Sequence, residues 1–346
     1  MTDDRIIIQN RMLSHISAEY DKSEGSFFYD AIKPVAIELE SSYREQEQIL
    51  DKGFAGTSTG EYLDKKVAEQ GLTRKPATKS TTVVTVTGSQ GAVINSGDKV
   101  ASDTVNFIFS ESKIIGALGH ESVSVECEEL GNVGNLPVGS IKYFPVTLPG
   151  LTGVTNPNPL TNGYDGEPDD ELRQRYFDKV RTPATSGNKY HYRNWAKEVV
   201  GVGDARVFPL WNGTGTVKVV IIDSNKKAAA PELVAETIDY IEVERPIGAT
   251  VTVISAAEIA ININVTLSLS LGYTLEQAKS SIETKVDNYL KEIAFQSDIV
   301  SFAILGSLIL EANGVCDHSD LTVNGGIANI SIGTEEVAVL GVVTVA

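Results

Sequence analysis

The clearest pattern in the chain is an alternation of apolar and polar positions across residues 259–271. Every odd position there is Ile, Val or Leu, and every even position is Ala, Asn, Thr or Ser. Because strand side chains alternate with a period of two, the segment predicts one strand of about 40 Å at ~3.3 Å per residue.

The second face of this predicted strand is polar but carries no charge, whereas a solvated strand usually carries Lys or Glu there, partly to prevent edge pairing. We therefore predict that the face touches other protein, and a simple one-sided sheet remains the alternative. The residues that carry this prediction are Asn262, Asn264, Thr266 and Ser268.

A capping box, Thr274 to Gln277, follows the strand and predicts the start of a helix. A short apolar helix that ends at Asn313-Gly314 and two or three short strands complete the chain. The residues that we expect to face inward from the first of these helices are Leu275, Ala278, Ile282, Val286, Tyr289 and Ile293.

A long helix is predicted from Gly25-Ser26 onward, with Pro34 expected to start or kink it. Its apolar positions recur at alternating gaps of four and three, as in the a and d positions of a coiled coil, and become polar near the end. Packing against the next domain and binding of another chain both fit this seam. Its apolar members are Phe28, Ile32, Val35, Leu39 and Ile49.

The middle of the chain changes from β-rich to mixed. Val123, Val125 and Cys127 alternate with Ser and Glu, which predicts a strand with one wet face in a small barrel or sandwich. The next part has the predicted element order α-α-β-β-α-β, which is typical of an α+β domain.

These patterns predict a multidomain α+β protein with two α+β domains of ferredoxin-like type. We expect a helical arm at residues 1–76, a β-rich domain at 77–164, one α+β domain at 165–255 and a C-terminal one at 256–346.

The chain has 346 residues and a formal charge of −17, which disfavours binding to nucleic acid or to an anionic membrane. Acids stand at the N-terminus where a signal peptide carries bases, and no apolar run reaches the ~20 residues of a membrane span. With only Cys127 and Cys316, a disulfide framework is not expected. We therefore expect folding in a reducing cytoplasm.

A search for chemistry finds no nucleotide-binding, hydrolase or zinc-protease motif. Cys316 and His318 are too few for a metal site, and the acids of residues 165–170 lack the glycine and the final carboxylate of a calcium loop. We predict no enzymatic activity, no cofactor and no metal.

Several segments nevertheless resemble the baseplate J-like proteins of contractile phage tails. Their ordered Gly, Pro and aromatic positions, which fix turns and packing, make the match specific. Upstream segments around Tyr62-Leu63-Asp64 and Gly131-Asn132 are also similar. The main segments are residues 156–167, 172–175, 186–188, 191–192, 195–196, 200–205, 209–217 and 245–249.

The resemblance implies a structural wedge protein of the baseplate, which joins hub, sheath and fibres and passes on the contraction trigger. In that family, paired copies form a ring, and N-terminal helices join a second wedge protein in a helical bundle. A sheath-initiator or lysozyme-like wedge protein is a further expected partner. By this analogy the helical seam suits the bundle and the uncharged strand face suits contact between copies. Expected locations are the bacterial cytoplasm during assembly and then the phage or bacteriocin particle.

Two other functions fit the composition. The β-rich middle and acidic charge also suit a carbohydrate-binding tail or surface protein. A cell-wall hydrolase that uses carboxylates such as Glu167 and Asp169 is a further alternative.

Overall fold

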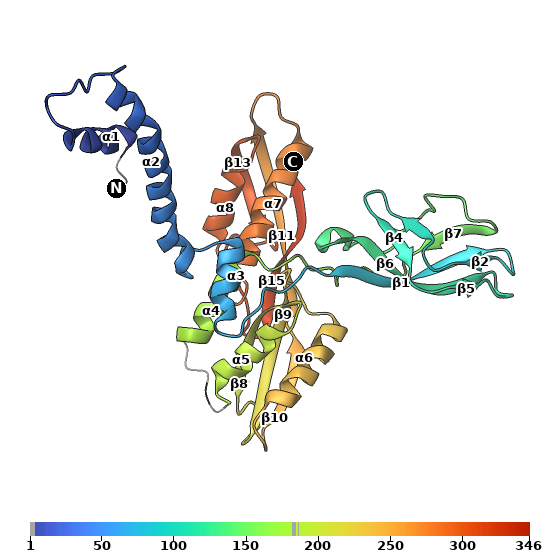
Figure 1. Ribbon diagram of the computed structural model, residues 1–346. Helices are drawn as coiled ribbons and strands as arrows, with labels where there is room; N and C mark the ends of the chain where they lie inside the picture. Colours follow the sequence, from blue (N-terminus) through green and yellow to red (C-terminus); the bar gives the residue numbers. More distant parts are fainter. Residues whose placement is uncertain (1–3, 182–184, 186) are drawn as a thin grey trace. The chain divides into compact units, whose positions relative to one another are not determined.

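The computed structural model describes residues 4–181, 185 and 187–346 (Figure 1). Ser186, which begins one segment of the family resemblance, lies outside the described residues. The chain forms two compact units. One combines Met1–Arg74 with Glu167–Val180, and the other combines Lys75–Gly166 with Arg181–Ala346.

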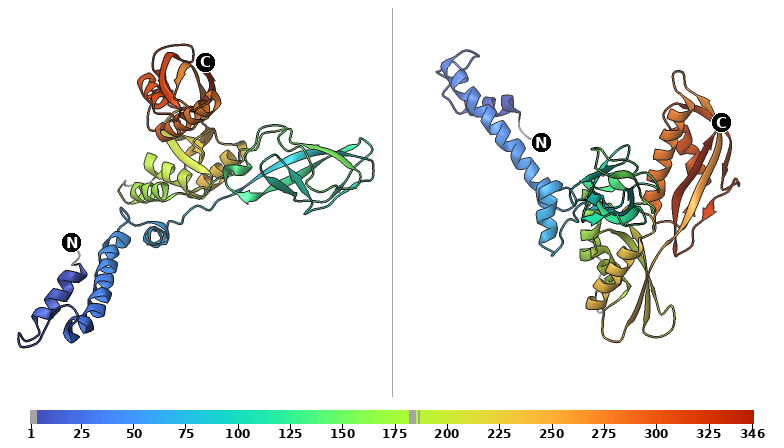
Figure 2. Two further views of the ribbon diagram at one scale, coloured as in Figure 1. Left: turned by 90° about the horizontal axis from the view of Figure 1, so that it is seen from above. Right: turned by 90° about the vertical axis from the view of Figure 1, so that its right-hand side faces the viewer.

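The first unit is helical. Helix α1 lies beside α2 in both views of Figure 2 and buries Ile8 and Leu13 against it, together with Ala36 of α2. The hydroxyl of Ser26 caps α2 by accepting from the Tyr29 N–H, so the helix begins before Pro34 and not at it. The helices are α1 (Arg5–Ser14), α2 (Phe27–Gly53), α3 (Gly60–Ala68) and α4 (Asp169–Arg181).

A β domain opens the second unit. Its five-stranded sheet has the order β3-β4-β6-β1-β7, and β2 pairs with β5. The sheet is nearly closed into a barrel, and Ala101 of β3 bridges to Tyr143, which lies in the segment before β7. The predicted alternation on β6 is confirmed by a buried Val123, Val125 and Cys127. The strands are β1 (Lys79–Gly88), β2 (Val93–Ile94), β3 (Lys99–Ala101), β4 (Asn106–Phe109), β5 (Lys113–Ile114), β6 (His120–Leu130) and β7 (Leu151–Thr155), with a 3-10 turn at Asn132–Gly134.

The central domain is a three-stranded sheet of order β10-β9-β8. Strands β9 and β10 are parallel and joined by α6, whereas β8 is antiparallel to β9. Tyr192, Trp195 and Ala196 of α5 are buried against this sheet, as their helical spacing predicts. The elements are α5 (Lys189–Glu198), β8 (Val202–Pro209), β9 (Thr216–Asp223), α6 (Pro231–Glu244) and β10 (Thr250–Ser255).

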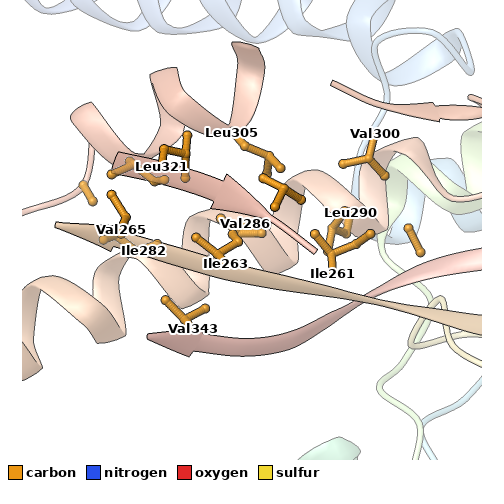
Figure 3. Close-up of a cluster of buried hydrophobic side chains, with 14 of the residues drawn as sticks. Ile261, Ile263, Val265, Ile282, Val286, Leu290, Val300, Leu305, Leu321 and Val343 are labelled. Carbon is orange, nitrogen blue, oxygen red and sulfur yellow. The ribbon is translucent and has the colours of Figure 1, made fainter. Parts of the chain in front are cut away.

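The C-terminal domain is built on β11, the long predicted strand, which is central in a sheet of order β13-β11-β15. Its apolar residues point toward α7 (Figure 3), and α8 packs into the same core, so both helices cover one face of the sheet. The elements are β11 (Ala257–Leu269), α7 (Leu275–Ile293), β12 (Ile299–Val300), α8 (Phe302–Leu310), β13 (Val315–Val323), β14 (Ile330–Ser331) and β15 (Glu336–Val345).

Helix α7 begins at the predicted capping box, in which Thr274 and Gln277 bond reciprocally. Its buried stripe runs at intervals of four and ends at Leu290, which the sequence pattern did not single out. The expectation for Leu275 was wrong: as the first helical residue it lies before the stripe and is 38% exposed.

Strand β9 contributes to two separate cores. Val219 and Ile221 point into the core of the central domain. Val220 and Ile222 point the other way, into a cluster that includes Val337 of β15. The central and C-terminal domains therefore meet through a shared apolar layer.

The α+β class is thus observed, and the β-rich part is a nearly closed, barrel-like sheet. The central and C-terminal sheets each have three strands, so neither forms a complete four-stranded ferredoxin-like sheet. Helix α4, which we expected in the third domain, belongs to the compact unit of the N-terminal helices. Our four-domain division stays a proposal.

The packing of β11 predicts that two substitutions at adjacent positions change the free energy of unfolding by very different amounts. Ile263→Ala removes a buried side chain beneath α7 and is expected to lower the free energy of unfolding by about 2–5 kcal/mol. Asn264→Ala, on the exposed face, is expected to change it by less than about 0.5 kcal/mol. Urea unfolding measures both, and equal effects would contradict the orientation of the strand.

Candidate assembly surfaces

The helical seam of the arm is only partly covered. Phe28, Ile32 and Leu39 are half-buried, whereas Val35 is 47% and Ile49 is 62% exposed. The described part of the arm therefore retains an apolar stripe on α2 that intramolecular packing does not bury.

Helix α1 uses a neighbouring face of α2. The Gln9 side-chain amide donates to the Tyr29 carbonyl oxygen at 3.1 Å, and Ala36 is fully buried beneath α1. Toward the C-terminal end of α2 the exposed apolar surface continues with Leu50, next to Ile49. An amphipathic helix with such a stripe is suited to bind a further helix.

The uncharged strand face lies on the side of the C-terminal sheet that α7 and α8 leave open, as the right view of Figure 2 shows. Asn262, Asn264, Thr266 and Ser268 are all exposed. Asn264 stands in register with a threonine on each neighbouring strand, so uncharged polar side chains extend across the sheet.

Asn262 has a structural role as well. Its side-chain oxygen accepts from the Val342 N–H at 2.9 Å, where the register of β15 against β11 shifts. A Cβ at Gly341 would lie 2.3 Å from this oxygen, so glycine is needed there. The side chain of Asn262 thereby holds a bulge in β15, and the other three residues of the face make no such bond among the described residues.

Glu167, a candidate hydrolase carboxylate, is committed to an ion pair. Both of its oxygens accept from Arg175, at 2.8 and 2.6 Å, and both side chains are less than 10% exposed. Arg175 also donates to the Thr73 carbonyl oxygen. The pair joins α4 to the chain segment after α3.

Asp169, the other candidate carboxylate, is held in the same way. It accepts from the Gly60 N–H at 2.9 Å and from Arg74 at 2.6 Å. These two partners, the backbone N–H first, lower the pKa of Asp169. Arg74 also binds Asp64 and the Glu167 carbonyl oxygen. Both carboxylates therefore accept hydrogen bonds from neighbouring residues that hold the structure together, which does not favour the hydrolase alternative.

A cavity of about 520 Å³ lies between the central and C-terminal domains. Arg193 binds Asp204 through two nitrogens at 3.0 Å, and Arg206 binds Asp298 at 2.8 Å while its guanidinium stacks 4.8 Å from the centre of the Phe295 ring. The described residues of the lining thus pair each of these arginines with an acid and bring together no nucleophile with a base.

Other candidate chemistry is also absent from the described residues. Within residues 4–181, 185 and 187–346, no three His, Cys, Asp or Glu side chains are grouped to hold a metal. His318 contacts the Gly306 carbonyl oxygen, while Cys316 is exposed. Asp165, the first of the acids at residues 165–170, accepts a hydrogen bond from the Asn132 N–H. No helix among the described residues is long and apolar enough to cross a membrane.

One buried acid, Asp223, forms no ion pair with a described residue. Asp223 ends β9, is 3% exposed and accepts from the Lys227 N–H at 2.8 Å. Burial raises its pKa to about 6. Gly203 lies so close to the Asp223 carbonyl that a Cβ would be 2.1 Å from the oxygen, so glycine is needed there.

Comparison with known families matches the three domains of the second unit. Residues 83–163 match the Baseplate J-like protein barrel domain, 184–255 the Baseplate J-like central domain and 261–346 the Baseplate J-like protein C-terminal domain. The chain belongs to the baseplate J-like family. The predicted resemblance is confirmed, and members of this family have a structural role in tail baseplates.

Individual proteins are similar to this baseplate J-like chain to different extents. Phage-like element PBSX protein XkdT of Bacillus subtilis (strain 168) is 35% identical over 98% of this chain and 96% of its own. Baseplate protein gp47 of Escherichia phage Mu is 28% identical over 63% of this chain and 64% of its own. A chain of the anti-feeding prophage (AFP) baseplate aligns over 98% of this chain and 99% of its own, with 10% identity and a TM-score of 0.38.

The sequence did not reveal two groups of contacts in this baseplate J-like chain. The ion pair of Arg74 with Asp169 and the hydrogen bond from Arg175 to the Thr73 carbonyl oxygen join residues about a hundred positions apart, and no local spacing predicts them. The role of Asn262 at the bulge depends on the register of β15, which alternation alone does not fix.

The buried ion pair predicts a large cost when one partner is removed. Arg175→Met leaves the Glu167 carboxylate buried without its cation and is expected to lower the free energy of unfolding by about 3–5 kcal/mol. Lys65→Met, which removes an exposed pair with Glu61, is expected to change it very little. Urea unfolding followed by circular dichroism tests the difference, and a mild effect at Arg175 would be the contrary result.

The raised pKa of Asp223 predicts a pH-dependent effect of Asp223→Asn. Between about pH 4 and pH 6 the folded state holds a proton that the unfolded state has lost, so the wild-type stability from this group falls as pH rises. The variant cannot ionise. Its stability relative to wild type is therefore expected to increase from about pH 4 to pH 7 in urea unfolding, and a constant difference would contradict the burial effect.

Proposed function

We propose that this chain is a structural wedge or inner-ring component of a contractile tail baseplate, where it links the hub, the sheath and the fibre network. The observation that carries the proposal is the match of all three domains of the second unit to the baseplate J-like family. Glu167 and Asp169 are both bound to arginines of the fold, which further supports a non-enzymatic role.

The arm is proposed to join a second wedge protein in a helical bundle. Val35 and Ile49 on α2 remain exposed after α1 has packed, and burying them in a bundle would be favourable. A sheath-initiator or lysozyme-like wedge protein is the third proposed partner. Nucleic acid and membrane are not proposed partners because the chain carries a charge of −17.

Copies of the chain are proposed to pair and to form a ring, with the open face of the C-terminal sheet between them. Asn264, Thr266 and Ser268 are exposed, uncharged and without a bonding partner among the described residues. Contacts of this kind add little charge repulsion between two acidic chains.

Relay of the contraction trigger is proposed to proceed by rearrangement of these contacts. A switch of this kind needs interfaces with two packings close in free energy. Assembly in the bacterial cytoplasm before incorporation into the phage or bacteriocin particle completes the proposal.

Co-purification with the second wedge protein tests the role of the arm. Val35→Asp combined with Ile49→Asp is expected to weaken the complex at least about tenfold, because each change removes an apolar contact worth roughly 1.5 kcal/mol or more. Mixing wild-type chain with the partner is expected to increase helicity in circular dichroism.

The matched control is Ser41→Asp combined with Gln48→Asp, which adds the same charge at exposed polar positions of α2 and should leave the complex intact. Unchanged helicity on mixing together with no co-elution of the wild-type proteins would refute the bundle.

A further inference from the structure

Strand β15 is an edge with one unused side. In the order β13-β11-β15 it pairs, within the described part of the chain, only with β11, in parallel. The Ala346 N–H donates to Val265 and the Ala257 N–H donates to the Glu335 carbonyl oxygen, which fixes the side of β15 that faces β11. Since these groups alternate along a strand, the N–H and C=O of Ala338, Leu340, Val343 and Val345 point away from the sheet.

No backbone hydrogen bond from these four residues to any other part of the described chain is formed on that side. An unpaired row of donors and acceptors is a template for another strand, and natural proteins usually blunt it with charge, proline or irregularity. Strand β15 holds one bulge, at Gly341, but has no proline, and its single charged residue is Glu336 at the very start.

The opposite edge of the same sheet is protected. Strand β13 carries exposed Asp317 and Asp320, and Asp320 has a φ of 54°. Its pairing with β11 shifts register twice. One sheet thus has a charged, irregular edge and an uncharged edge. On the uncharged edge Leu340 and Val345 are partly exposed, whereas Ala338 and Val343 are 6% and 3% exposed, so another strand can add at Leu340 and Val345.

We propose that β15 pairs antiparallel with β15 of a second copy of this chain, about a two-fold axis, to form one continuous six-stranded sheet. The occupant is a second copy because the edge is self-complementary. A two-fold axis pairs β15 with itself and places the two Glu336 residues at opposite ends of the ladder, so that uncharged residues meet between two chains of charge −17.

This arrangement rests on the proposed pairing of copies: the edge contact forms each pair, and the open face of the sheet is left to join pairs into the ring. The two-fold axis stands perpendicular to the sheet, so α7 and α8 of both copies lie on the same side. On the other side, the exposed faces around Asn264 and Thr344 become one surface. Edge pairing and this face are separate contacts, and substitutions can distinguish them.

Sedimentation equilibrium of the full chain tests whether copies dimerise through β15. The chain carries Val35→Asp and Ile49→Asp, so that the apolar stripe of α2 does not contribute to association. A dimer is expected. Val342→Lys and Thr344→Lys, at exposed positions of β15, bring like charges together across the axis and should raise the dissociation constant at least tenfold. Ser319→Lys on β13 should leave it unchanged.

Asn264→Lys separates edge from face, because it charges the central strand but not β15. The dimer should survive this change, and its loss would overturn edge pairing in favour of face-to-face contact. A monomer at every concentration, or a dimer indifferent to both β15 lysines, would also overturn the proposal. In those cases, retained co-purification of the second wedge protein with the chain that keeps its wild-type arm would leave the baseplate function standing.

Disulfide trapping gives a second readout that does not depend on affinity. In a Cys316→Ser background, Val342→Cys or Thr344→Cys should form a covalent dimer on mild oxidation, because residues near the axis lie beside their own counterparts. Ser319→Cys is the matched control and should remain monomeric. Trapping through Ser319→Cys alone would place the contact on the other edge and reject the proposal.

Discussion

Burial of one face of β11 beneath α7 is the interaction on which the C-terminal half of the molecule depends. Ile261, Ile263 and Val265 bring the strand, both helices and the neighbouring strands into one core. Because side chains alternate along a strand, this burial also decides which residues face outward. A shift of one residue would place asparagine and threonine in the core and isoleucine in solvent.

The same logic explains what could be predicted from sequence. Strict alternation predicted β11, and the reciprocal bonds of Thr274 and Gln277 predicted the start of α7, since both depend on neighbours within a few positions. The long helix after Ser26 was predicted for the same reason. The ferredoxin-like expectation went further than local patterns allow, because strand order is set by pairing between distant segments.

Polar contacts between residues far apart in the chain could not be predicted from the sequence. Arg74 and Arg175 look like ordinary surface cations in the sequence, yet they hold α4 against the segment that follows α3. Their partners are separated along the chain or set by a helix start, and only folding brings them together. For the seam residues, sequence predicted an apolar stripe. Which part of it α1 would cover could not be read from the pattern, because α1 packs on an adjacent face through Ala36.

The double-sided burial of β9 has a mechanical consequence. Its even and odd side chains are buried in different cores. Separating the C-terminal domain from the central one would therefore expose Val220 and Ile222 to water, which is unfavourable. A force that displaces one domain is therefore transmitted to the other through β9. A flexible linker between the domains would instead allow one to move without the other.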